Sequence, residues 1–386
     1  MSIINKEFFY LHDSTSYEFR PASGIMQLNT GDPVFLENEY WYIEFKHSLQ
    51  DVDKFIPPVI MERIINGDIH LMLCNSHEAF HSVVKEIYLR VIDQLGVPPN
   101  KVTLLSESAD INQEIHNVAK DAGREQISSA WTRIFEHACM CHLTYNRSID
   151  FMQLPILVDK VYDKKFLNFN RRWRLHRPAL VALMHVRGIL SRGHVSLAPC
   201  DDNNDWASVW EWMKSQHQGN DEITSILIAN EEGILKIPPM YLDTDELITN
   251  RAELESRADY LYSDTYFSVV SETNFYDFSP GRFLSEKIFK PVAMGHPFIL
   301  LSRPNSLQLL RRLSYQTFSP WIDESYDQEE DDNRRLLMIL NEIERLSNLT
   351  PNELTDFLNG VRDICLFNRR ILKSKRAFYN ILPKYP

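Results

Sequence analysis

The sequence is poor in cysteine and contains no long apolar run. Its cysteines are scattered and odd in number, which is typical of a reducing compartment and not of a disulfide framework. No apolar stretch approaches the roughly 18 residues that a membrane helix needs. The first residues, MSIINKEFFYLHD, lack the apolar core of a signal peptide. We therefore expect a soluble, cytoplasmic protein. The five cysteines are Cys74, Cys139, Cys141, Cys200 and Cys365.

Positive charge is scarce in the first part of the chain. Residues 1–160 carry 13 Lys and Arg against 22 Asp and Glu, a net charge of −9, whereas the remainder carries −3. An acidic surface disfavours binding to the phosphate backbone of a nucleic acid. The positive charge of the second part is clustered, and a local cluster of charge indicates a binding site better than the total charge does.

The chain has the length of two domains, since 386 residues exceed one typical domain. In the first part, apolar runs at 69–74 and 101–105 predict strands, and helical periodicity appears at 78–95 and 111–122. This alternation predicts βαβ units around a parallel sheet.

The alternation restarts after residues 150–165. Strands are expected at 165–170, 194–197, 266–270 and 297–301, helices at 178–187 and from Glu286, and a further element at 223–229. The capping box Thr350-Pro-Asn-Glu353 predicts a last helix that runs to about Cys365. The predicted fold class is α/β, with two Rossmann-like domains facing a cleft. The predicted divisions are 1–160, 161–350, and a C-terminal helix with a basic tail at 351–386.

A basic segment, Asn170-Arg-Arg-Trp-Arg-Leu-His-Arg-Pro178, lies between an expected strand and an expected helix. A helix N-terminus favours anions, and arginine can grip phosphate oxygens with two donors. We predict pyrophosphate binding here and favour Arg171 and Arg177 as its ligands. The alternative is a solvated basic turn.

A second segment, Phe283-Leu-Ser-Glu-Lys287, opens another expected helix. Ser285 can cap this helix. Glu286 could accept hydrogen bonds from a ribose diol, and Lys287 could place a positive charge on a phosphate. The alternative is a surface Glu–Lys pair at the start of an ordinary helix.

These segments resemble the donor site of GT-B glycosyltransferases. The string from Ser285 to Ile299 is similar to the E-K…G-x-P segment of α-1,3-fucosyltransferases. The order of 170–177, 285–291 and Asp323-Glu-Ser-Tyr-Asp327 resembles a group of glycosyltransferase-like proteins of phages and bacteria, over roughly residues 160–345. The chain has Ile288 where that group often has Thr.

The resemblance implies a glycosyltransferase that uses a nucleotide-diphosphate sugar, UDP- or GDP-linked, without a further cofactor. It implies that Glu286 binds the ribose, and that Lys287 and the arginines bind the diphosphate. The C-terminal division would then bind the nucleotide sugar, and the N-terminal division would face the acceptor. The acceptor could be a glycan, a lipid-linked saccharide or, in a phage setting within the host cytoplasm, a hydroxymethylated DNA base.

Candidates for the general base follow the first expected strand, where an inverting transferase would need a proton acceptor. We favour Glu78 or His77, with Asp110 in reserve; the alternative is that Glu78 merely caps a helix. In the loop after residue 270, Glu272 or Asn274 could bind sugar hydroxyls, or the loop could simply be polar.

Three weaker patterns leave rival functions open. Asp243-Thr-Asp245 and Asp51-Val-Asp53 match the metal-binding Asp-x-Asp of GT-A transferases, but we expect no metal site. His137-Ala-Cys-Met-Cys-His142 has imperfect zinc spacing, and the basic stretch Arg369–Arg376 could contact nucleic acid. Besides a metal-dependent GT-A enzyme, a non-catalytic nucleotide- or phosphosugar-binding protein is the alternative.

Overall fold

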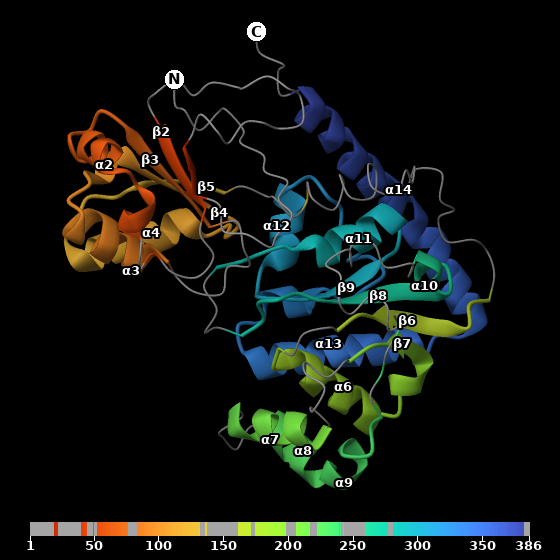
Figure 1. Cartoon of the computed structure of the whole chain (residues 1–386). Helices are drawn as coiled ribbons and strands as arrows, with labels where there is room; N and C mark the ends of the chain where they lie inside the picture. The colour runs from red at the N-terminus through yellow and green to blue at the C-terminus, as the bar shows by residue number, and fades with distance from the viewer. Residues whose placement is uncertain are drawn as a thin grey trace. The chain divides into compact units, whose positions relative to one another are not determined.

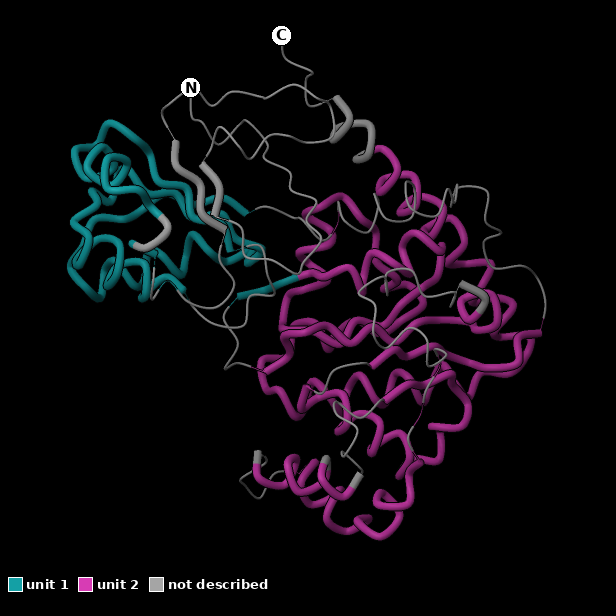
Figure 2. The backbone as a smooth tube through the Cα atoms, viewed as in Figure 1, with its two compact units in different colours: residues 1–134, 278–283, 380–386 teal, residues 135–277, 284–379 magenta. Residues whose placement is uncertain are grey.

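Two compact units make up the chain in the computed structural model (Figure 2). Unit 1 comprises Met1–Ile134, Phe278–Phe283 and Asn380–Pro386, and unit 2 comprises Phe135–Asp277 and Leu284–Tyr379. The predicted divisions at residues 160 and 350 stay predictions. The structure describes residues 19–21, 40–44, 49, 52–75, 83–131, 136, 161–170, 174–197, 206–216, 222–238, 240, 242, 259–276 and 281–381.

Unit 1 is built on a five-stranded sheet in the order β1-β2-β3-β4-β5. Only β1 runs antiparallel to its neighbour, while β2 to β5 are parallel. The strands are β1 (Phe19–Pro21), β2 (Tyr40–Glu44), β3 (His70–Asn75), β4 (Val102–Ser106) and β5 (Ser128–Trp131). The helices are α2 (Pro58–Ile65), α3 (Val84–Ile87) and α4 (Ile111–Ala122), with short 3-10 turns at Val52–Phe55 and Pro99–Lys101.

The core of unit 1 comes from the apolar faces that the sequence predicts. Strands β3 and β4 are buried along almost their whole length. In α4, Ile111, Ile115 and Ala119 lie on one face and join the core. Of the helix expected over 78–95, residues 78–82 lie outside the described residues, and the described part is helical but differs in type, with α3 followed by a π-helix at Tyr88–Gln94.

Unit 2 has a four-stranded, fully parallel sheet in the order β7-β6-β8-β9. Helices α6 and α13 cover one face, and α10 and α11 cover the other (Figure 1). The strands are β6 (Lys164–Asn168), β7 (Gly193–Val195), β8 (Thr265–Ser271) and β9 (Phe298–Leu301). The helices packed on them are α6 (His176–Val186), α10 (Asp259–Tyr262), α11 (Glu286–Met294) and α13 (Asp332–Ser347).

The remaining elements lie around this layered core. They are α7 (Trp206–Gln216), α8 (Glu222–Ala229), α9 (Glu231–Ile234), α12 (Ser306–Arg312), α14 (Pro351–Ile381), and 3-10 turns at Leu190–Arg192 and Ser325–Gln328. The last helix, α14, extends well beyond the expected end at Cys365. Gly360 of α14 lies against the Trp321 indole, and a Cβ atom at this position would overlap the ring.

The predicted α/β class with two Rossmann-like units is confirmed, since each unit combines a mainly parallel sheet with helices. The cleft between them stays a prediction. No helix in the described part of the chain is both long and apolar enough to span a membrane.

Candidate functional site

The topology of unit 2 marks one position on its sheet as a candidate ligand site. From β6 the chain passes through α6 to β7 on one side, and from β8 it passes through α11 to β9 on the other. The order therefore reverses between β6 and β8. In open parallel sheets, ligands bind beyond the carboxyl ends of the strands at such a switch point. Helices α6 and α11, which follow these two strands, both begin at this edge (Figure 1).

A buried amide network closes the carboxyl ends of β6 and β8. Asn168 Nδ2 donates to the Val269 carbonyl at 2.7 Å and to Ser271 Oγ at 3.2 Å. Asn170 Nδ2 donates to Asn168 Oδ1 at 2.5 Å, and its backbone N–H donates to Ser196 Oγ at 3.1 Å. The network fixes the geometry of both strand ends at the switch point.

The first residues of α6 hold the loop that follows β8. Arg177 is buried, and its Nη2 donates to the carbonyls of Ser271 and Glu272 at 3.0 and 3.1 Å. His176 Nε2 also donates to the Glu272 carbonyl, at 2.9 Å, and the ring stacks on Phe275. Burial, reinforced by the charge of Arg177, holds the pKa of His176 well below its usual range. The ring is therefore neutral.

Arg335 of α13 holds the same loop, a role that no sequence pattern predicted. The side chain is fully buried, and its Nη2 donates to the Phe275 carbonyl at 2.6 Å while its Nε donates to the Ser302 carbonyl at 3.2 Å. Its guanidinium also lies 4.3 Å from the centre of the Phe275 ring. No local sequence pattern distinguishes Arg335 from the solvated cations of an amphipathic helix, so its buried role could not be predicted.

The N-terminus of α11 is capped as predicted. Ser285 Oγ accepts a hydrogen bond from the Lys287 backbone N–H at 3.2 Å. Ser285 is itself fixed by Glu272, whose Oε1 accepts from the Ser285 N–H at 3.0 Å and whose Oε2 accepts from its hydroxyl at 2.5 Å. Glu272 is fully buried, and burial raises the pKa of its carboxyl. Its predicted contact with sugar hydroxyls stays a prediction, while its observed bonds position the helix cap.

Lys287 and Glu286 lie together on the first turn of α11 and are partly exposed. Lys287 Nζ lies 3.0 Å from Glu286 Oε1 and 3.2 Å from Ser285 Oγ. Burial acts to raise the pKa of Glu286, but the charges of Lys287 and Lys290 outweigh it and lower that pKa. This turn thus presents a cation and a carboxylate beside the switch point.

The other predicted site residues either lie outside the described residues or contact other groups of the protein. Arg171, His77 and Glu78 lie outside the described residues, so their roles stay predictions. Arg177 is described, but the observed contacts of its Nη2 are with backbone carbonyls, and its binding of a phosphate stays a prediction. In unit 1, the reserve base Asp110 accepts hydrogen bonds from the Arg282 backbone N–H and guanidinium, so its described carboxylate contacts are with the protein itself.

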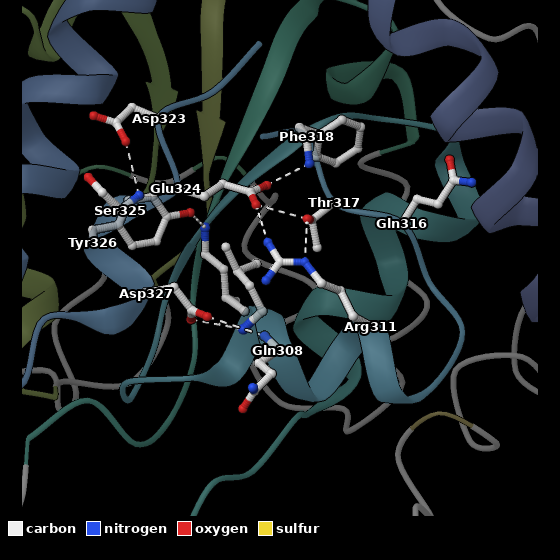
Figure 3. Close-up of polar contacts among 12 residues, drawn as sticks. Gln308, Arg311, Gln316, Thr317, Phe318, Asp323, Glu324, Ser325, Tyr326 and Asp327 are labelled. Carbon is white, nitrogen blue, oxygen red and sulfur yellow. Dashed lines mark hydrogen bonds and ion pairs between the residues drawn. The ribbon is translucent and has the colours of Figure 1, made fainter. Parts of the chain in front are cut away.

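The segment Asp323–Asp327 is a scaffold for α12 (Figure 3). Asp327 Oδ1 accepts from the Leu307 N–H at 2.9 Å, and its Oδ2 accepts from the next N–H at 3.2 Å. Glu324 pairs with the guanidinium of Arg311 on the same helix. These bonds give the segment a structural reason to be present that requires no ligand.

None of the three metal-binding patterns is described in full, because Asp51, Asp243 and Asp245 lie outside the described residues, as do His137 and His142. Within the described ranges, no cluster of three or more His, Cys, Asp or Glu side chains could hold a metal ion.

Comparison with known proteins gives only distant structural similarity. The UDP-forming α,α-trehalose-phosphate synthase of Burkholderia xenovorans is 9% identical, with a TM-score of 0.38 over 84% of this chain and 76% of that chain. The N-terminal domain of Candida albicans trehalose-6-phosphate phosphatase is 10% identical, with a TM-score of 0.39 over 90% and 71%. The glycotransferase of kitacinnamycin is 8% identical, with a TM-score of 0.31 over 84% and 94%. No protein-family model and no curated protein matches the sequence. Similarity this low assigns no activity.

Proposed function

We propose that this protein is a glycosyltransferase that moves a sugar from a nucleotide-diphosphate sugar to a hydroxyl acceptor. The observation that carries the proposal is the first turn of α11, where Lys287 and Glu286 lie together beside the switch point of the unit 2 sheet. A nucleotide sugar offers a diphosphate to the cation and a ribose diol to the carboxylate.

The chemistry required of this site is stabilisation of the leaving nucleoside diphosphate. As the glycosidic bond to the diphosphate breaks, negative charge builds on its oxygens. A preorganised ammonium group and the partial positive charge of a helix N-terminus stabilise such charge. Lys287 supplies the ammonium group at α11, and the arginines of segment 170–177 are the further candidates. With these groups in place, the transfer needs no metal ion.

The acceptor hydroxyl has to lose a proton as the new glycosidic bond forms. Glu78 and His77 remain our candidates for the base that takes it. The acceptor classes remain a glycan, a lipid-linked saccharide or a hydroxymethylated DNA base, and the last would have to be flipped out of its duplex.

A thermal-shift screen against UDP-, GDP-, dTDP- and CMP-sugars tests the proposal, because a ligand that binds only the folded state raises the unfolding temperature. We expect a UDP- or GDP-sugar to give the largest shift. Slow hydrolysis of that sugar nucleotide would then distinguish an enzyme from a non-catalytic binding protein. The absence of any shift would contradict the proposed function.

A further inference from the structure

The amide oxygen of Asn170 is a buried acceptor that the protein leaves unused. The side chain is completely buried at the carboxyl end of β6, and its Oδ1 has no hydrogen-bond partner within the described part of the chain. Buried polar atoms are nearly always paired, and leaving one unpaired costs about 1–3 kcal/mol. The position therefore points to a hydrogen-bond donor that comes from outside the protein chain.

The orientation of this amide follows from its neighbours. The Val269 carbonyl can only accept, so the atom of Asn168 that faces it is Nδ2 and the other is Oδ1. Asn168 Oδ1 in turn can only accept, so Asn170 directs its Nδ2 at it and keeps Oδ1 for another partner. Turning the Asn170 amide over would place two carbonyl oxygens against each other.

The chemistry of an amide oxygen restricts the ligand group that it can contact. Ionised phosphate oxygens are acceptors and cannot pair with another acceptor. Hydroxyl groups of a sugar and N–H groups of a base are donors. The site thus combines a cationic turn suited to phosphate, at Lys287, with an acceptor suited to the uncharged parts of the same molecule.

We propose that Asn170 Oδ1 accepts a hydrogen bond from a hydroxyl or N–H group of the sugar nucleotide, outside its phosphates. This inference rests on the proposed function and adds a specificity-determining residue to its site. Asn170 would distinguish a sugar nucleotide from a bare polyphosphate, whereas Lys287 would favour both.

The test is calorimetric binding of UDP-glucose, UDP, GDP-mannose, GDP and pyrophosphate to the full chain and to Asn170→Ala. We expect Asn170→Ala to weaken the better-bound sugar nucleotide about fivefold to tenfold, as for one lost hydrogen bond. Its affinity for pyrophosphate should stay within about twofold of the parent. If the nucleoside diphosphate loses as much affinity as the sugar nucleotide, the contact is with the nucleoside. If only the sugar nucleotide loses affinity, the contact is with the sugar. Both results support the proposal.

Two controls separate binding from folding. Ser196→Ala removes the acceptor of the Asn170 backbone N–H but leaves the amide in place, so it should not discriminate among the probes. If Asn170→Ala does not fold, Asn170→Ser is used instead, and the same loss of sugar-nucleotide affinity is expected.

Unchanged affinities with a lowered unfolding temperature would overturn the inference, because the oxygen would then serve a buried water. Equal weakening of every probe, pyrophosphate included, would overturn it as well. If the parent protein binds none of the sugar nucleotides or nucleoside diphosphates, the proposed function fails, and the inference fails with it.

Discussion

Glu272 accepts two hydrogen bonds from Ser285, one from its backbone N–H and one from its hydroxyl. The two residues are separated by the loop that joins β8 to α11. Because Ser285 also caps α11, the buried carboxylate fixes the point at which this helix begins. The position of Lys287 thus depends on a residue of the neighbouring strand end as well as on its own helix.

Lys287→Ala should weaken sugar-nucleotide binding by roughly tenfold or more, as expected for the loss of a charge-assisted hydrogen bond. Stability should change by less than about 1 kcal/mol, since the side chain is partly exposed. Calorimetry and thermal unfolding measure the two effects. Lys236→Ala is the matched control, because Lys236 also pairs with a glutamate on a helix surface. Equal affinity in both variants would remove Lys287 from the site.

Glu78→Gln should abolish glycosyl transfer while leaving sugar-nucleotide affinity nearly intact. Gln keeps the shape of the side chain but cannot take a proton, so an interaction made only in the transition state is lost. The measurements are turnover and sugar-nucleotide affinity on the same preparation. Turnover within about tenfold of the parent, under about 1.4 kcal/mol of barrier, would exclude Glu78 as the base. His77 would then be tested before Asp110, whose carboxylate is held by Arg282.

Glycosyl transfer should survive EDTA, because the proposed site neutralises the diphosphate with protein cations. The measurement is the transfer rate before and after chelation, followed by addition of Mn²⁺. A complete loss that Mn²⁺ restores would support the metal-dependent alternative. Asp243→Asn and Asp245→Asn would then be the variants to examine.

His296 should make the protein sensitive to acid. Burial lowers its pKa from 6.5 to about 4, while the unfolded chain titrates near the ordinary value. The neutral ring therefore contributes about 3 kcal/mol at most to the free energy of unfolding. This contribution is complete above pH 6.5 and is lost as the pH falls toward 4. Denaturant unfolding from pH 7 to 4 should show a shallower pH dependence for His296→Gln. An unchanged slope would contradict the assignment.

Asp327→Ala should cost about 1–2 kcal/mol of stability, as for the loss of a helix cap, because two N–H groups of α12 lose their acceptor. Sugar-nucleotide affinity should not change selectively if Asp323–Asp327 is a scaffold. Asp323→Ala is a milder control, since the described hydrogen bonds of the Asp323 carboxylate are with the nearby Ser325, through its backbone N–H and its side chain, and not with α12. Loss of affinity without loss of stability would instead place Asp327 in the ligand site.

The sequence predicted those features whose causes are local. Strands β3 and β4 and helix α4 follow from runs and periodicity within a dozen residues. The Ser285 cap also follows from its immediate neighbours. The continuation of α14 past Cys365 could have been anticipated, since no Gly or Pro occurs between residues 361 and 381.

Features that depend on contacts between residues far apart in the chain could not be predicted from the sequence alone. Arg177 belongs to a basic run that suggests an exposed turn, yet the partners of its Nη2 are the carbonyls of Ser271 and Glu272, 94 and 95 residues further along the chain. The interior place of Glu272 depends on Ser285, which no spacing rule connects to it. The unused oxygen of Asn170 becomes visible only once every neighbouring donor and acceptor is assigned.

The contact between Gly360 and Trp321 bears on how this protein could be engineered. Propensity scales recommend replacing a mid-helix glycine by alanine, for a gain of about 1 kcal/mol. Here the added methyl group would have to displace an indole ring, so the substitution that looks safest from the sequence should lower thermostability. A consensus or propensity-guided redesign of α14 should therefore treat positions 321 and 360 as one unit and vary them together.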